Sequence, residues 1–276
     1  MLLSGCSIVK EGIKKRKPGL MGLERAGSFA VVYAPVKTEQ LMPFDLLILE
    51  SDAFTKGEVT TLKKQHKLVL AYLNVGELET YRKYGCKIPP QWLVSKNPRW
   101  QDHYFINPGE KGWQDLLIHK IIPPLLRRGY QGFLFDSVDM ASPARFPEYK
   151  DDMAHLINRI RRAFPHILII LNNGDFLLDQ IAGDIQGLLV EEVFSDITDD
   201  GSVTVRPDME RLAILSRWER IKSKWNLPVF FVDYIPGDDR LPLTAIRDIY
   251  RKAKLIPYIT DKNAQAIHKE YLIRKE

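Results

Sequence analysis

Short apolar runs separated by polar segments recur along most of this chain. Runs of this length bounded by turn residues are typical of strands buried on both faces in a parallel sheet. Their polar or acidic final residues mark the point where each strand would leave the sheet. Eight runs predict strands, at Phe29–Tyr33, Asp45–Glu50, Leu68–Asn74, Gly132–Asp136, Ile167–Asn172, Gly187–Glu191, Val229–Tyr234 and Leu255–Ile259.

Helix-compatible segments lie between consecutive apolar runs. The clearest is Glu148–Phe164, whose apolar residues recur at helical spacing on one face. Further helices are expected over Glu58–His66, Gly112–Arg128 with a break at Pro123-Pro124, Phe176–Ala182, Asp208–Trp225, Leu243–Ala253 and Asn263–Arg274. This alternation of strands and helices predicts parallel βαβ units with right-handed connections.

Eight such units favour closure into a (β/α)8 barrel. The 276 residues of the chain suit a fold that typically needs about 250. An open doubly wound sheet is the alternative, but no Gly-rich dinucleotide-binding fingerprint follows the first predicted strand. We therefore predict an α/β protein with a single TIM barrel over residues 28–276, preceded by a polar, basic linker over residues 1–27.

The net charge of the protein is +5, and much of the excess lies between Lys10 and Lys17. We interpret this basic stretch as a solvated tether, because no aromatic or recognition-helix pattern accompanies it, and we expect no nucleic-acid partner. The two cysteines, Cys6 and Cys86, are too few for a disulfide framework or a zinc site. No apolar run reaches the 18 or more residues of a membrane-spanning helix.

The sequence Leu3-Ser4-Gly5-Cys6 resembles the lipobox of bacterial lipoproteins, in which the cysteine carries the lipid. The basic and apolar regions of a signal peptide do not precede it, so this interpretation requires a start upstream. It predicts a protein of the bacterial cell envelope or a secreted one, in contact with a membrane only through lipid on Cys6. The alternative is a chance match, with Cys6 a free thiol in an ordinary N-terminal segment.

Polar side chains collect at the carboxyl ends of the predicted strands, which is the end that carries the active site in a TIM barrel. The absence of histidine and lysine from these ends argues against a histidine-rich metal site and against a Schiff-base aldolase. Carboxylates, amides and tyrosines remain, as in glycoside hydrolases. The candidate site residues are Tyr33, Glu50, Tyr72, Asn74, Glu77, Asp136, Asp139, Asn172, Asn173, Glu191, Glu192, Asp233 and Tyr234.

Glycoside cleavage needs one ionised carboxyl group at the anomeric carbon and one protonated carboxyl group at the leaving oxygen. Asp136 and Glu191 end strands two positions apart, which separates their backbones by roughly 10 Å. Two inward-pointing acidic side chains would reduce that gap to the about 5–5.5 Å of a retaining pair. A capping or solvated role is the alternative for either acid.

Four motifs stand in order at these strand ends: Tyr72-Leu-Asn-Val-Gly-Glu77, Gly129-Tyr-Gln-Gly-Phe-Leu-Phe-Asp136-Ser-Val-Asp139, Leu171-Asn-Asn-Gly174 and Val190-Glu-Glu-Val-Phe194. Together they resemble the motifs of glycoside hydrolase family 114, TIM-barrel enzymes of the endo-α-1,4-polygalactosaminidase type. The resemblance extends from about Ser28 to Ile259. It implies that Asp136 is the nucleophile and Glu191 the acid/base. Some members have a cysteine where this chain has Val193, so the choice between Glu191 and Glu192 stays open.

Acids crowd the predicted mouth of the barrel although the protein as a whole is basic. They include Asp199 and Asp200 besides the strand-end carboxyls. Such a mouth would attract a cationic ligand, for instance a de-N-acetylated galactosamine or glucosamine polymer. The alternative is that these acids only form turns and cap helices.

The connection from about Glu77 to Glu110 is too long for a plain turn. It carries Tyr81, Trp92 and Trp100, and Trp113 follows it. Aromatic faces stack on sugar rings, so the connection would wall a glycan groove. A satellite hydrophobic cluster is the alternative.

These observations predict a monomeric, retaining glycosidase that acts on an amino-sugar polysaccharide, with the remaining candidate residues binding substrate. We expect no cofactor and no bound metal. Two alternatives remain open. One is a non-catalytic glycan-binding barrel. The other is a barrel lyase in which Asp136, Asp139 and Glu191 ligate a divalent cation.

Overall fold

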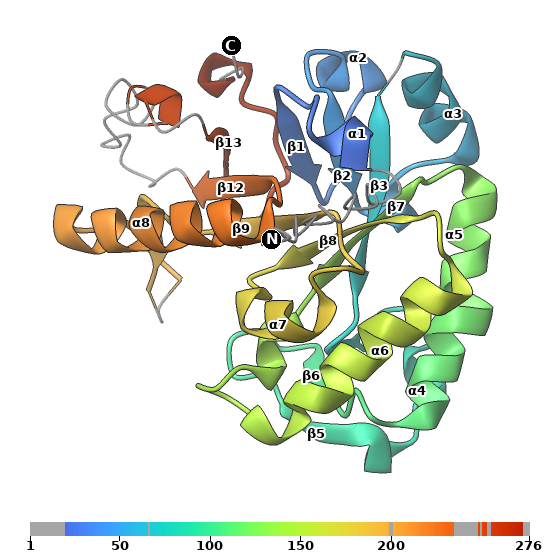
Figure 1. Cartoon of the computed structure of the whole chain (residues 1–276). Helices are drawn as coiled ribbons and strands as arrows, with labels where there is room; N and C mark the ends of the chain where they lie inside the picture. Colours follow the sequence, from blue (N-terminus) through green and yellow to red (C-terminus); the bar gives the residue numbers. More distant parts are fainter. Residues whose placement is uncertain are drawn as a thin grey trace, which may run out of the picture.

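Eight parallel strands form a nearly closed barrel in the computed structural model, which describes residues 20–65, 67–198, 201–234, 248, 250–252 and 255–272 (Figure 1). The prediction of a TIM barrel is confirmed, and each predicted strand lies within one residue of its observed bounds. In sheet order the strands are β1 (Phe29–Val32), β2 (Leu46–Leu49), β3 (Leu68–Asn74), β7 (Gly132–Asp136), β8 (Leu168–Asn172), β9 (Gly187–Glu191), β12 (Val229–Tyr234) and β13 (Ile256–Thr260).

The first and last strands meet through side chains packed inside the barrel. The ring of Phe29 on β1 lies 5.1 Å from that of Phe230 on β12 and 5.7 Å from that of Tyr258 on β13, between ring centroids. Just beyond β1, the backbone N–H of Tyr33 donates to the carbonyl of Ala264 at 2.8 Å. Burial of these large rings is a main source of barrel stability, because apolar surface leaves water.

Helices cover the outer face of the barrel, with α6 beside the continuous helix that α4 and α5 form along one flank (Figure 1). The longer ones are α3 (Lys56–Lys64), α4 (Lys111–Leu116), α5 (Ile122–Arg128), α6 (Lys150–Ala163) and α8 (Asp208–Trp225), and the short ones are α1 (Leu20–Leu23), α2 (Thr38–Leu41) and α7 (Leu178–Ile181).

The helix break expected at Pro123-Pro124 does not occur. A π-helical turn over Leu117–Ile121 joins α4 directly to α5, and the prolines lie in the first turn of α5. Backbone N–H groups in a first turn have no partner within their own helix, so proline is tolerated there.

Two predictions from the sequence need correction: the end of the linker and the last helix. Leu23 and Ala26 are buried in the core, so the part of the predicted linker from residue 20 onward belongs to the barrel domain. The helix expected over Asn263–Arg274 is replaced, as far as residue 272, by turns and a short 3-10 segment at Lys269–Tyr271. Most of the helix expected over Leu243–Ala253 lies outside the described residues.

Cys6 and the basic stretch from Lys10 to Lys17 also lie outside the described residues, so lipidation of Cys6 stays a prediction. Loss of membrane fractionation in a Cys6→Ser variant of the full gene product is the expected result, and unchanged fractionation would contradict it.

In the part of the chain that the structure describes, no helix has both the length and the apolar composition needed to cross a membrane.

The long connection after β3 folds into a three-stranded antiparallel sheet, here called the accessory sheet. Its strands are β4 (Glu77–Glu79), β6 (His103–Ile106) and β5 (Leu93–Lys96), in that spatial order. Only Val75 and Gly76 separate β4 from β3. A Cβ atom at Gly76 would lie 1.9 Å from the carbonyl oxygen of Ser137, so glycine is needed where the chain passes the end of β7.

Candidate active site

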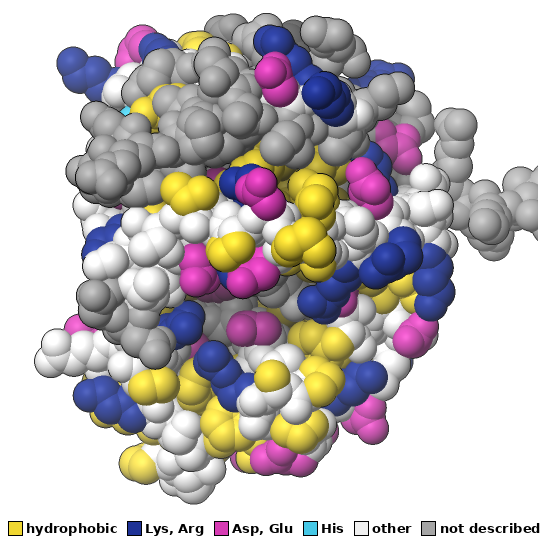
Figure 2. Space-filling model, turned by 90° about the vertical axis from the view of Figure 1, so that its left-hand side faces the viewer, with side chains coloured by type: hydrophobic (Ala, Val, Ile, Leu, Met, Phe, Trp, Pro, Cys, Tyr) yellow, Lys and Arg dark blue, Asp and Glu magenta, His cyan; other side chains and the backbone are white. Residues whose placement is uncertain are grey.

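A hollow crosses the face of the molecule toward which β12 points, and acidic side chains gather around it (Figures 1 and 2). In a parallel barrel this is the face to which the carboxyl ends of the strands lead. The residues at those ends belong to different strands, and hydrogen bonds show which of them come together.

Asp136 is the last residue of β7 and lies between donors from both neighbouring strands. The hydroxyl of Tyr72, on β3, donates to its Oδ2 at 2.8 Å, and the side-chain amide of Asn172, on β8, donates to its Oδ1 at 2.8 Å. The amide of Asn74 donates to the Tyr72 hydroxyl at 3.3 Å. The carboxyl group of Asp136 is therefore held in one orientation across three adjacent strands.

Glu191 is the last residue of β9, one strand beyond Asn172. Burial, together with the charge of Asp136, raises the pKa of its carboxyl to about 8, although hydrogen bonds from Tyr234 and Asn172 act in the opposite direction. Asn172 thus contacts both carboxyl groups. Glu191 keeps its proton at neutral pH beside a second carboxyl group whose two oxygens accept hydrogen bonds.

Glu192 points to different partners. Its backbone φ is +61°, which turns the chain directly after β9. Its Oε2 accepts a hydrogen bond from the backbone N–H of Ile197 at 3.1 Å and lies 3.9 Å from the guanidinium of Arg206. Of the two adjacent glutamates, Glu191 is therefore the one that shares the surroundings of Asp136.

The same turn follows each of the three neighbouring strands. Ser137, Asn173 and Glu192 come directly after β7, β8 and β9, with φ of +57°, +50° and +61°. Non-glycine residues rarely adopt this left-handed conformation, and such strain concentrates at functional sites. Asn173, predicted to bind substrate, is one of these half-buried turn residues.

Two tyrosines border the pair of carboxyl groups. Burial raises the pKa of Tyr33 well above its usual value, with further contributions from Asp136 and Glu191. Burial and the charge of Glu191 do the same for Tyr234. The ring of Tyr33 lies 4.9 Å from that of Tyr72, between centroids. The hydroxyls of Tyr33 and Tyr234 therefore stay protonated at neutral pH, and that of Tyr234 donates to Glu191.

Asp139 adds a third carboxyl group, on a 3-10 turn after β7. Burial and the charge of Asp136 raise its pKa to about 6. Among the described residues, no group of three or more His, Cys, Asp or Glu side chains is arranged to hold a metal ion.

Two predicted substrate-binding residues have structural roles instead. Glu77 is buried, accepts a hydrogen bond from the Asn97 amide at 2.7 Å and pairs with Nδ1 of His103 at 2.8 Å, so it holds the accessory sheet together.

Asp233 has no exposed surface. It accepts hydrogen bonds from the backbone N–H groups of Phe194 and Ser195 at 2.7 and 2.9 Å, and from the hydroxyl of Tyr250. It therefore fixes the chain after β9 to β12, including the short strand β10 (Ser195–Ile197), which pairs with β11 (Val203–Val205). Both acids were predicted to bind substrate because they stand at strand ends. That prediction is wrong, because their oxygens face protein donors.

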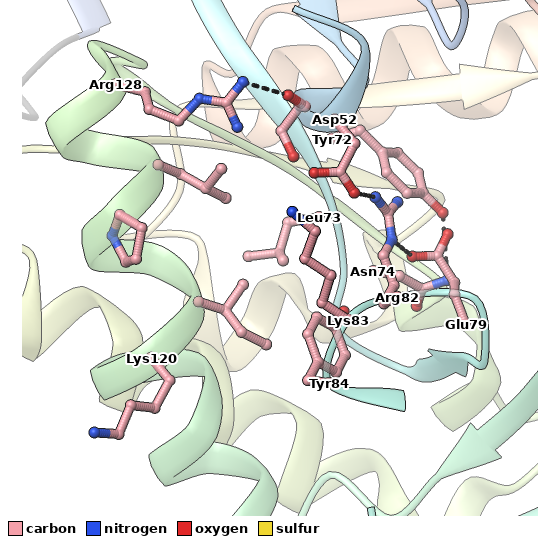
Figure 3. Close-up of a pocket in the computed structure, with 14 residues that line it drawn as sticks. Asp52, Tyr72, Leu73, Asn74, Glu79, Arg82, Lys83, Tyr84, Lys120 and Arg128 are labelled. Carbon is pink, nitrogen blue, oxygen red and sulfur yellow. Dashed lines mark hydrogen bonds and ion pairs between the residues drawn. The ribbon is translucent and has the colours of Figure 1, made fainter. Parts of the chain in front are cut away.

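Arg82 was missed in the sequence, and it pairs with three acids on one side of the predicted acidic mouth. Its guanidinium binds both oxygens of Glu50 at 2.7 Å, Glu79 at 2.6 Å and Asp52 at 3.1 Å. Figure 3 shows Arg82 with Glu79 and Asp52 at the edge of a pocket of about 230 Å³, which Lys83, Tyr84 and Lys120 also line. Glu50 is thus an ion-pair partner of Arg82, and substrate binding by Glu50 stays a prediction.

The other side of the mouth has a similar arrangement. Arg206 pairs with Asp196 at 2.5 Å and with Glu210 at 3.1 Å, and lies near Glu192. Part of the predicted acidic mouth is therefore paired with arginine, while Asp199 and Asp200 lie outside the described residues.

Replacement of Arg82 by alanine is expected to destabilise the fold by about 3–5 kcal/mol, because it leaves largely buried carboxylates without their ion-pair partner. The side chains of Arg82, Glu79 and Glu50 are only 9%, 3% and 15% exposed. Urea unfolding measures the effect. Lys83→Ala, at the exposed neighbouring position, is the matched control and should stay within about 0.5 kcal/mol of the wild type. Equal stability of the two variants would show that the cluster is not a structural anchor.

Comparison with known proteins places this arrangement among carbohydrate-active enzymes. The sequence model of Glycoside-hydrolase family GH114 matches residues 15–272. The glycoside hydrolase domain of PelA from Pseudomonas aeruginosa superposes with a TM-score of 0.78 at 20% identity, over 88% of this chain and 97% of that one. Ega3 from Aspergillus fumigatus, solved in complex with galactosamine, gives a TM-score of 0.64 at 16% identity, over 86% and 91% of the two chains.

Two relatives by sequence are themselves uncharacterised. A protein of Thermotoga maritima is 28% identical over 76% of this chain and 70% of its own length. A protein of Methanocaldococcus jannaschii is 25% identical over 78% of this chain and 67% of its own length.

Proposed function

The chain belongs to glycoside hydrolase family 114, and from that premise we propose that it cleaves an amino-sugar polysaccharide by a retaining mechanism. Asp136 is the nucleophile and Glu191 the acid/base. The observation that carries this proposal is the contrast between the two carboxyl groups that Asn172 contacts. One accepts hydrogen bonds at both oxygens, and the other has a pKa of about 8.

In the first step Asp136 attacks the anomeric carbon and forms a covalent glycosyl-enzyme. Glu191 donates its proton to the leaving glycosidic oxygen as the bond breaks. Tyr72 and Asn172 orient the attacking carboxylate. In the second step Glu191, now ionised, takes a proton from water, the water oxygen attacks the anomeric carbon, and Asp136 is released.

Charge supports an amino sugar as the substrate unit. The ionised form of Asp136 raises the pKa of both Asp139 and Glu191, which means that Asp136 repels each of these two carboxyl groups when they are ionised. A substrate ammonium group among them would relieve that repulsion. The complex of Ega3 with galactosamine points to the same class of sugar for a protein of similar fold.

The test is release of reducing ends from purified polysaccharides. De-N-acetylated and N-acetylated α-1,4-galactosamine polymers are compared with neutral glucans in the presence of excess chelator. We expect release from the galactosamine polymers, faster for the de-N-acetylated form and unaffected by chelator. Binding without release would favour the non-catalytic barrel, and loss of activity with chelator would favour the metal-assisted lyase.

A further inference from the structure

We infer that Tyr81, Trp100 and His103 form a sugar-binding subsite beside the catalytic carboxyl groups, which holds a residue of the polysaccharide away from the cleaved bond. The inference rests on the proposed function and extends it to the accessory sheet. The three rings are called the aromatic platform below.

Two large aromatic side chains in the long connection after β3 are exposed to solvent. Tyr81 is 62% and Trp100 is 53% exposed. Two nearby tryptophans are used differently: Trp113, in α4, is fully buried, and Trp92 packs over Gly112, where a Cβ atom would lie 2.1 Å from the indole. Clustered exposed apolar side chains often mark ligand-binding grooves.

The exposed rings form one continuous surface through His103. Its ring centroid lies 6.1 Å from that of Tyr81 and 6.0 Å from that of Trp100. The planes are tilted by 53° and 36°, so the rings do not stack face to face on one another. The three rings therefore do not cover one another's faces by stacking.

Hydrogen bonds and a cation–π contact hold Tyr81 and His103 in place, and a backbone hydrogen bond ties Trp100 to His103. The Tyr81 hydroxyl donates to Glu79 at 2.8 Å, and the Arg82 guanidinium lies 5.2 Å from the centroid of the Tyr81 ring. His103 is held by Glu77, and its backbone N–H donates to the carbonyl of Trp100 at 3.2 Å. A surface fixed before the ligand arrives loses less conformational entropy on binding, which favours affinity.

The platform is tied to the nucleophile by an unbroken series of hydrogen bonds. Glu77, which holds His103, donates its backbone N–H to the side-chain oxygen of Asn74 at 2.8 Å. Asn74 donates to Tyr72, and Tyr72 donates to Asp136. The charge of Asp136 also contributes to the raised pKa of His103. The platform therefore adjoins the site, on the side of β3 and β4.

The chemistry of the platform matches an amino-sugar residue. The C–H face of a pyranose packs on an aromatic ring, and an ammonium group beside a ring gains cation–π attraction. Because this contact lies away from the bond that breaks, its binding energy is available only to substrates long enough to reach it.

The experiment compares Trp100→Ala and Tyr81→Ala with Trp100→Phe and Tyr81→Phe, which keep a ring. Each variant is assayed on de-N-acetylated α-1,4-galactosamine oligomers of defined length and on an activated aryl galactosaminide. We expect the alanine variants to lose about tenfold in kcat/KM on long oligomers, with little change on the aryl glycoside and with most activity kept in the phenylalanine variants.

Equal losses on long and short substrates, or none on either, would overturn the subsite. If the wild type cleaves the polymer and the alanine variants keep its preference for long chains, only the subsite is rejected. A wild type that cleaves neither substrate rejects the proposed function as well, and with it the subsite.

Discussion

Asp136→Asn is expected to abolish turnover of every glycoside, with a fall in kcat of about 10⁴-fold or more. Asparagine keeps the size of the side chain but replaces one carboxylate oxygen with an amide nitrogen, and an amide does not attack the anomeric carbon. The loss should be the same for a polymer and for an activated aryl glycoside, because both need the covalent step. Steady-state kinetics on both substrates measures it, and thermal unfolding confirms that the variant is folded.

The matched control is Asp139→Asn, three residues further along the chain. Asp139 is also partly buried and its pKa is also raised, so the control tests whether any carboxyl group near the mouth gives the same loss. We expect Asp139→Asn to keep at least about a tenth of the activity, since it removes only an interaction with substrate or with Asp136. A more damaging effect at Asp139 than at Asp136 would mean that the nucleophile is wrongly assigned.

Glu191→Gln is expected to lower kcat on the natural polymer by about 10²–10⁴-fold, the usual contribution of general acid catalysis. Substrates with activated leaving groups need no proton, so formation of the glycosyl-enzyme should be largely spared. Azide should then restore turnover and give a glycosyl azide of retained configuration. Glu192→Gln is the control: its partners are Ile197 and Arg206, and its loss should be small.

The pH dependence of the activity is a second test of the role of Glu191. The required form of Glu191 is protonated, and its pKa is raised to about 8. Polymer hydrolysis by the wild type should therefore fall as the pH rises through about 8, and this limb should be absent when Glu191→Gln acts on an activated substrate. Were Glu192→Gln the more damaging change, the acid/base would be the second glutamate.

The strands and the main site residues could be predicted because their signals are local. An apolar run closed by a polar residue is enough to place Asp136, Asn172 and Glu191 at one end of a parallel sheet. The direction of the strands then brings Tyr72 beside Asp136 without any knowledge of the loops.

The errors concern side chains whose partners come from distant parts of the chain. Glu77 and Asp233 also stand at strand ends, but Asn97 and His103 in one case, and Tyr250 in the other, turn them into buried acceptors. Arg82 lies 32 residues from Glu50, and no spacing rule marks their pairing. The folding of the long connection into the accessory sheet is what makes these contacts.

The sequence also could not distinguish the role of Glu191 from that of Glu192, because they are adjacent residues of the same type. A backbone φ of +61° at Glu192 separates their side chains. This turn depends on the packing of β9 against its neighbours, which the local sequence does not report.

The central claim is that Asp136 and Glu191 act as a retaining pair, and the stereochemistry of the product tests it most directly. Proton NMR of the reaction mixture, recorded before mutarotation, identifies the anomer that forms first from an α-linked galactosamine oligomer. The account predicts that the first product is the α-anomer, with retained configuration. Initial formation of the β-anomer would mean a direct attack by water and would contradict the role of Asp136 as nucleophile.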